Sequence, residues 1–150
     1  MKHIILLFLF VPFFVGARAQ FTLTNTSTIS IADLRVDPDP WPLALQRVIK
    51  SSDTVYILSF RDKQFPNSVN MSTLKFGNLE QLRYFQKALS ALKSSSNGEQ
   101  ADFKNFSIKR TDIRGPKKME VKYVLTCTDG DLTDIQQPEA DKLVAAIKAL

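Results

Sequence analysis

The fold is decided by the stretch Thr54-Val-Tyr-Ile-Leu-Ser-Phe60, which is rich in β-branched and aromatic residues. Side chains in a strand alternate between its two faces, and both alternating sets in this stretch are apolar. One set contains Val55 and Ile57, and the other contains Tyr56, Leu58 and Phe60. A strand that is apolar on both faces is typical of a position covered on both sides. We therefore predict a central β-strand here.

A second strand is predicted directly after the first. Charges and a proline interrupt the strand pattern between Arg61 and Asn67. The second strand then runs from about Ser68 to Phe76. A change of its apolar face near Ser72 indicates a bulge or an edge position.

A long helix follows this pair of strands. It begins after Asn78, a good N-cap residue, and Gln81 is placed to reciprocate the capping hydrogen bond. Apolar residues recur at steps of three and four along the helix and form one stripe. The stripe consists of Leu79, Leu82, Phe85, Ala88, Leu89 and Leu92. We interpret the stripe as the face that packs on the sheet, and a groove-binding helix is the alternative.

The start of the 150-residue chain has the pattern of a secretory signal peptide. An apolar run from Ile4 to Val15 follows a short basic end, and the small residues Ala17 and Ala19 match a cleavage site. We therefore predict that residues 1–19 are removed and that the protein is exported, to a periplasm or out of the cell. The apolar run is shorter than the roughly 20 residues of a membrane-spanning helix, so an uncleaved anchor is the less favoured alternative.

The remaining chain has the size of one domain. Without residues 1–19, 131 of the 150 residues remain, which is enough to bury a single core. The formal charge falls from +5 to +3, because Lys2 and Arg18 leave with the signal peptide. Such a charge keeps a domain soluble without requiring a polyanionic partner.

The protein has one histidine, His3, and it lies in the predicted signal peptide. The mature chain therefore lacks an essential part of Ser-His-Asp and Cys-His catalytic systems and of histidine-ligated zinc or copper sites. Hydrolases built on those parts are excluded.

Cys127 is the only cysteine, so the chain cannot form an internal disulfide. Apolar residues alternate along Met119–Cys127, which places the thiol on the inward face of a strand. We interpret Cys127 as a buried structural residue. A reactive thiol or an intermolecular disulfide is the alternative.

The N-terminal segment is harder to assign. Gln20–Ser30 is either a mobile lead-in or an edge strand, and partial disorder is the favoured interpretation. Ile29–Leu34 is a candidate short strand. The prolines of Asp37–Pro42 predict a stiff connector, in which Trp41 either contacts a partner or covers one end of the core. A short helix is predicted for Pro42–Ser51. Its narrow apolar stripe consists of Leu45, Val48 and Ile49.

After the long helix, Ser94–Gly98 is predicted to be a flexible connector. Strands at Phe103–Thr111 and Met119–Thr128 form a second hairpin. The dipeptide Asp129-Gly130 predicts a tight turn, after which Leu132–Ile135 adds a few paired residues.

A last helix opens at Pro138. Its inward-facing residues are Ala140, Leu143, Val144, Ile147 and Leu150. We therefore expect residues 53–150 to form one α+β domain, a two-layer sandwich in which two β-hairpins make an antiparallel sheet with helices on one face (ββαββα). Residues 20–52 precede it as an N-terminal segment with the proline-rich connector and the short helix. The repeated element order suggests a duplicated architecture, without a repeat at the level of residues.

Basic residues gather around the second hairpin. They are Lys109, Arg110, Arg114, Lys117, Lys118 and Lys122. This cluster is a candidate site for an anionic surface, such as lipid headgroups or a polyanionic glycan. Nucleic acid is an unfavoured partner, because the interleaved aromatic residues of a stacking platform are missing. The other interpretation is that these charges keep the hairpin soluble and discourage edge pairing.

Acidic residues offer two weaker candidates. Asp129, Asp131 and Asp134 could attract calcium, but their spacing is not that of an EF-hand, and a solvated turn is favoured. Asp53 and Asp62, at the two ends of the central strand, could form a carboxylate pair for glycosidic chemistry. No glycine-rich phosphate loop or dinucleotide motif occurs, so we expect no cofactor.

Three triplets match the acceptor for N-glycosylation. They begin at Asn25, Asn70 and Asn105. The pattern is short and does not show whether the host modifies it.

Three segments resemble a pattern found in small exported bacterial proteins of uncharacterised function. They are Tyr56-Ile-Leu-Ser-Phe-Arg-Asp62, Leu74-Lys-Phe76 and Leu79-Glu-Gln-Leu-Arg-Tyr-Phe-Gln-Lys-Ala-Leu89. The resemblance implies export and the fold, and it suggests a bacterial cell envelope. It implies no catalytic or binding residue.

These observations favour a non-enzymatic binding or interaction module of the cell envelope, with an envelope protein or an anionic surface as partner. One alternative is an enzyme that uses carboxylate, lysine or tyrosine chemistry without histidine. Another is a structural envelope component that assembles through its edge strands.

Overall fold

The computed structural model describes residues 26–36, 43–64, 69–115 and 119–150. The first half of the chain forms a four-stranded antiparallel sheet followed by a helix. These elements are β1 (Thr26–Asp33), β2 (Ala44–Lys50), β3 (Asp53–Arg61), β4 (Met71–Phe76) and α1 (Leu79–Lys93). The second half repeats this order. Its elements are β5 (Gln100–Asp102), β6 (Phe106–Arg114), β7 (Met119–Cys127), β8 (Leu132–Gln136) and α2 (Gln137–Lys148).

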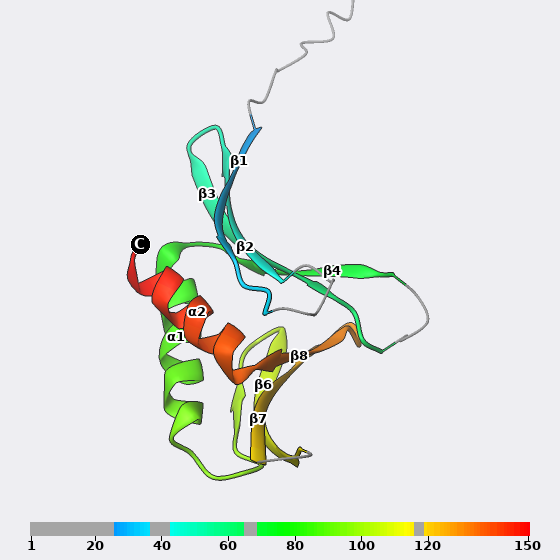
Figure 1. Ribbon diagram of the computed structural model, residues 1–150. Coiled ribbons are helices and arrows are strands. Elements are labelled where there is room, and N and C mark those ends of the chain that lie inside the picture. Colours follow the sequence, from blue (N-terminus) through cyan, green and yellow to red (C-terminus); the bar gives the residue numbers. More distant parts are fainter. Residues whose placement is uncertain (1–25, 37–42, 65–68, 116–118) are drawn as a thin grey trace, which may run out of the picture.

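The protein is therefore of the α+β class, with two separate sheets in which the strands follow one another in chain order (Figure 1). The expected order had two strands before each helix and one sheet. The structure has four strands before each helix and two sheets. The short strands expected near Ile29–Leu34 and at Leu132–Ile135 correspond to β1 and β8, so β2 and β5 are the strands that the sequence did not predict.

The expectations for the stretch around β3 are largely confirmed. β3 lies between β2 and β4, and β4 is one of the two edge strands of the first sheet. The register between β3 and β4 is regular, so the bulge expected near Ser72 is absent from this pair. The irregularity of this sheet lies instead in β1, between Ser30 and Ala32. On the face of β3 away from the helices, Val55 and Ile57 are half-buried and not fully covered.

The short helix predicted for Pro42–Ser51 is wrong. Residues Ala44–Lys50 form β2, which pairs with β1 on one side and with β3 on the other. Leu45 and Ile49 fit a helix stripe and an alternating strand equally well, and Arg47 on the same strand face hid the alternation. Pairing on both sides then outweighs the local helical preference.

The start of the described chain confirms part of the N-terminal assignment. The strand expected at Ile29–Leu34 is the end of β1, which already begins at Thr26. The partial disorder favoured for Gln20–Ser30 is therefore wrong for Thr26–Ser30, because these residues pair with β2 as part of an edge strand. The predicted signal peptide, the connector at 37–42 and Trp41 lie outside the residues that the structure describes. The boundary predicted before residue 53 falls in the turn that joins β2 to β3.

The two halves share residues as well as element order. β3 and β7 hold the same place in their sheets, and both contain the pattern Tyr-(Ile/Val)-Leu-(Ser/Thr), followed three residues later by Asp. The two copies are Tyr56–Asp62 and Tyr123–Asp129. On the other side, Tyr56 pairs with Arg47 in β2 and Tyr123 pairs with Arg110 in β6, so an arginine lies opposite the tyrosine in both halves. The repeated element order expected from the sequence is present, and the shared residues are confined to this short stretch.

Both helices cover the core with the predicted stripes and contact strands of both sheets. In α1 the buried residues are Leu82, Phe85, Gln86, Leu89 and Leu92, and in α2 they are Glu139, Ala140, Leu143, Val144 and Ile147. Leu150 departs from the prediction, because it follows the end of α2 and is 36% exposed.

Candidate functional site

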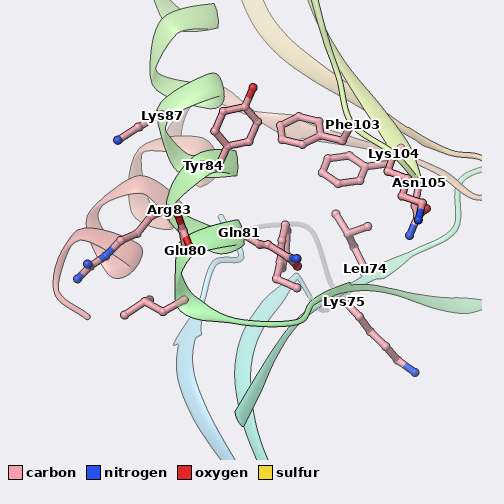
Figure 2. A pocket seen from close by; sticks show the side chains of 13 residues that line it. Leu74, Lys75, Glu80, Gln81, Arg83, Tyr84, Lys87, Phe103, Lys104 and Asn105 are labelled. Atoms are coloured by element: carbon pink, nitrogen blue, oxygen red, sulfur yellow. The ribbon is translucent and has the colours of Figure 1, made fainter. Parts of the chain in front are cut away.

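An open groove of about 710 Å³ lies where the two halves meet. One wall is the end of β4, another is the first half of α1, and the third is the connection from β5 to β6 (Figure 2). Its apolar and aromatic lining consists of Leu74, Phe76, Leu79, Tyr84, Phe103 and Phe106. The groove therefore joins side chains that are far apart in the sequence.

Aromatic rings form one side of this groove. Phe103 and Phe106 are stacked, with ring centroids 4.2 Å apart and an interplanar angle of 8°. Tyr84 meets Phe103 edge to face at 5.6 Å, although the tyrosine is 64% exposed. Phe106 also contacts Phe76 and Phe85, which anchors the stack in the core. Phe106 is thus a buried core residue and Phe103 is half-buried, whereas the ring of Tyr84 lies mostly in solvent.

Local hydrogen bonds fix the two turns that border the groove. The Oδ1 atom of Asn78 accepts from the Gln81 amide at 2.9 Å, so Asn78 is the N-cap predicted from the sequence. Gln81 reciprocates, but its Oε1 atom accepts from the amide of Gly77 at 2.8 Å. On the other wall, the Phe103 amide donates to the Phe106 carbonyl at 2.8 Å, which closes the turn that carries Lys104 and Asn105.

The rim of the groove is positively charged. Four basic residues line it, Lys75, Arg83, Lys87 and Lys104, against the single acid Glu80. Figure 2 shows the charged ends of Lys75, Arg83 and Lys87 directed away from the floor of the groove. Among the described residues, none of these four side chains forms a salt bridge. The lining of the groove therefore has an excess of positive charge, with four basic residues against one acid.

Glu80, Tyr84 and the three lysines Lys75, Lys87 and Lys104 are the groups lining the groove that could transfer a proton. Glu80 is the only carboxylate among the residues described as lining it.

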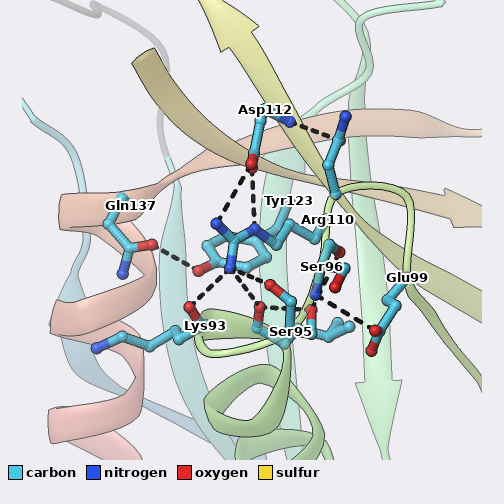
Figure 3. Close-up of polar contacts among 10 residues, drawn as sticks. Lys93, Ser95, Ser96, Glu99, Arg110, Asp112, Tyr123 and Gln137 are labelled. Carbon is cyan, nitrogen blue, oxygen red and sulfur yellow. Dashed lines mark hydrogen bonds and ion pairs between the residues drawn. The ribbon is translucent and has the colours of Figure 1, made fainter. Parts of the chain in front are cut away.

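The described members of the predicted basic cluster on the second hairpin differ in their environment. Arg110 points inward and donates from Nη1 to the carbonyls of Lys93 and Ser95 at 2.8 and 2.6 Å, at the end of α1 (Figure 3). Its Nε donates to Asp112 at 2.9 Å, which contributes to raising the pKa of Arg110 above its usual value. Lys122 pairs with Asp134 at 3.0 Å.

The other members of that cluster are placed differently. Lys109 and Arg114 are exposed on β6, and Lys117 and Lys118 lie outside the described residues. Of the four described members, Arg110 and Lys122 therefore form hydrogen bonds or salt bridges within the chain. Anion binding by the cluster stays a prediction.

The connector at Ser94–Gly98 is held by more contacts than its composition suggests. Arg110 donates a hydrogen bond to the carbonyl of Ser95. In addition, the Oδ1 atom of Asn97 accepts from the Asp112 amide at 2.9 Å. Gly98 has a φ of +88° and donates to the Arg110 carbonyl at 3.0 Å. The expectation of a connector without side-chain order is therefore wrong.

The acidic candidates have structural partners. Asp134 lies between Lys63 and Lys122 and forms a salt bridge with each. Burial favours a higher pKa for Asp134, but the hydrogen bonds from the two lysines outweigh it and lower the pKa. Within the described chain, no group of three or more acids, cysteines or histidines is arranged to hold a metal ion, so Asp129, Asp131 and Asp134 do not converge.

Asp53 and Asp62 do not form a pair. They lie at opposite ends of β3, a strand of nine residues, and are therefore separated by about 30 Å. Asp62 is only 3% exposed and accepts from the amides of Gln64 and Leu132 at 3.0 and 3.1 Å. Its role is to join the end of β3 to the start of β8.

The remaining sequence candidates fall as follows. Cys127 is a free and buried thiol, as predicted. Burial raises its pKa to about 11, and the charges of Asp129, Asp131 and Asp62 add to this effect. Asn70 and Asn105 are exposed, and Asn25 lies outside the described residues.

The sequence did not point to the groove. Phe103 and Phe106 read as core residues, and nothing local indicated that they stack beside α1. Tyr84 offered a signal, because it is a large aromatic residue on the polar side of an otherwise regular amphipathic helix.

No protein-family model matches the chain, and no curated protein is significantly similar to it. Neither α1 nor α2, the helices within the described residues, has the length and apolar character needed to cross a bilayer.

Proposed function

We propose that this protein is an exported, non-enzymatic binding module of a cell envelope, and that the groove between its halves binds an anionic amphipathic ligand. One observation carries the proposal: an aromatic groove is bordered by basic side chains that have no salt-bridge partner within the described chain. An apolar floor suits the apolar part of a ligand, and the charged rim suits its anionic group.

The size and the exposure of the groove support this use. Ligand sites usually have volumes of about 300 to 1,000 Å³, and the groove falls within that range. The aromatic side chain of Tyr84 lines the groove and is largely exposed to solvent. Exposed apolar surface of this kind, rimmed by charge, is typical of interaction sites.

Export to a cell envelope forms part of the proposal and is supported by the sequence. The signal-like start of the chain and the resemblance to small exported bacterial proteins both favour it. We also infer that the two helices form one layer over the inner faces of both sheets, as in a two-layer sandwich, because each helix contacts strands of both.

Calorimetric titration of the purified protein with sodium dodecanoate, below its micelle-forming concentration, tests the proposal. Dodecyltrimethylammonium, which has the same chain and the opposite charge, is the matched probe. We expect the carboxylate to bind at one site and the cation to bind at least about tenfold more weakly. Equal binding of both, or binding of neither, would contradict the proposal.

Two charge reversals locate the site. Lys104→Glu changes the rim of the groove, and Lys109→Glu makes the same change on β6, in the hairpin cluster. We expect Lys104→Glu to weaken dodecanoate binding about tenfold at low salt and Lys109→Glu to have less than about a twofold effect. The opposite order would assign anion binding to the hairpin cluster.

A further inference from the structure

The free edge of β4 distinguishes this strand from the other three edge strands. The two sheets have four edges in all, β1, β4, β5 and β8. An exposed edge offers unpaired amides and carbonyls to another strand, and proteins usually blunt such edges.

Three of the edges are blunted. β1 has a register shift between Ser30 and Ala32, and β5 has only three residues. At the start of β8, the backbone of Leu132 is engaged by neighbours from the first sheet: its carbonyl accepts from the Lys63 amide at 2.7 Å, and its amide donates to Asp62.

β4 has none of these features. It pairs with β3 in regular register over Met71–Phe76. In the described part of the chain, no backbone group of β4 is hydrogen-bonded outside its ladder with β3. Met71 at its start is 45% exposed, so the edge is also partly apolar.

This edge borders the groove. Three consecutive residues of β4, Leu74, Lys75 and Phe76, line it, although side chains in a strand alternate between two faces. Leu74 and Phe76 point into the protein, while Figure 2 shows the side chain of Lys75 directed away from the groove. The groove therefore follows the edge of β4, and is not confined to one face of the strand.

We propose that the occupant of the groove is an extended acidic peptide segment of a partner protein, which adds to β4 as a fifth strand of the first sheet. This inference rests on the proposed function and names its ligand. A side chain of the peptide on the inner face enters the space between Leu74 and the stacked rings of Phe103 and Phe106. Carboxylates on the peptide meet the positive charge of the rim, which includes Lys87 and Lys104.

The test uses a defined peptide and the purified protein. The probe is a fluorescein-labelled, acetylated seven-residue peptide in which Glu alternates with Leu and a central Phe. Two further versions carry N-methyl groups on alternate amides, one set on each edge of the strand. The two versions have the same charge and the same side chains, but each lacks the hydrogen-bond donors of one edge.

Fluorescence anisotropy should show that the unmodified peptide binds. One methylated version should lose at least about tenfold in affinity, and the other should bind within about threefold of the unmodified peptide. Amide hydrogen exchange should slow in β4 and not in β1 when the peptide is present. Lys104→Glu should weaken the peptide about tenfold at low salt, with Lys109→Glu as its control.

Other outcomes overturn the inference in distinguishable ways. If dodecanoate binds at the groove and the peptide does not, the binding function stands and the peptide ligand is wrong. If both methylated versions bind like the unmodified peptide, strand addition is wrong. If the protein alone protects β4 more strongly at higher concentration, a second copy of the chain occupies this edge. If neither probe binds, the proposed function fails as well.

Discussion

Asp134 shows how a residue that resembled a metal ligand serves the fold. Its carboxylate is 20% exposed and pairs with both Lys63 and Lys122. We expect Asp134→Asn to lower the free energy of unfolding by about 1 to 2 kcal/mol at pH 7, because two partly buried lysines lose their partner. Asp141→Asn, which removes the exposed partner of Lys93, is the control and should cost less than about 0.5 kcal/mol.

The stability that Asp134 contributes through its two salt bridges should decrease at acidic pH. Because the pKa of Asp134 lies below its ordinary value of 3.8, its contribution is present above that pH and is lost as the pH falls through the lowered pKa. The difference in unfolding free energy between Asp134→Asn and the unchanged protein should therefore shrink below about pH 4. A difference that stays constant down to pH 2 would show that the carboxylate has no stabilising charge interaction.

Cys127 should be unreactive in the folded protein. The thiol is buried, and its pKa of about 11 leaves little thiolate at pH 8. Ellman's reagent should modify it only after denaturation. A Ser96→Cys variant supplies an exposed thiol as a control and should react at once with one equivalent. Fast reaction of the unchanged protein would show that the strand β7 opens or that the thiol faces solvent.

At the scale of elements, the duplication gives two arginines the same place with different roles. Arg47 lies opposite Tyr56 in the first sheet, and Arg110 lies opposite Tyr123 in the second. Arg110 caps the end of α1, whereas the Nε atom of Arg47 is buried without a hydrogen-bond partner in the described chain.

This difference predicts that replacement by methionine affects stability differently at the two positions. Arg47→Met should leave the unfolding free energy within about 0.5 kcal/mol, because it removes a buried donor that has no acceptor. Arg110→Met should clearly lower the melting temperature, since the last carbonyls of α1 lose their donor. Thermal unfolding of both variants checks this. Equal effects would mean that the cap does not stabilise the helix end.

The elements also show what the sequence could predict. β3, α1, the second hairpin and α2 carry long and regular apolar patterns, and each was located from them. β2 was missed because Leu45, Val48 and Ile49 suit a helix as well as a strand, and only its two neighbours decide between them. The residues shared around Tyr56 and Tyr123 form only a short stretch, and their corresponding positions became clear only from the register.

At the scale of the whole molecule, the groove depends on how the halves meet. β4 and α1 come from the first half, and Phe103 and Phe106 come from the second. No local pattern reports such a contact, so the candidate site could not be read from the sequence. The sequence pointed instead to the hairpin cluster, where Arg110 and Lys122 are engaged within the chain.

The most direct test of the groove as the binding site is a map of backbone amide chemical shifts during titration of the purified protein with sodium dodecanoate. The account predicts saturable shifts confined to Leu74–Phe76, the first half of α1 and Phe103–Phe106. Shifts confined to the hairpin of β6 and β7, or no saturable shifts at all, would contradict it.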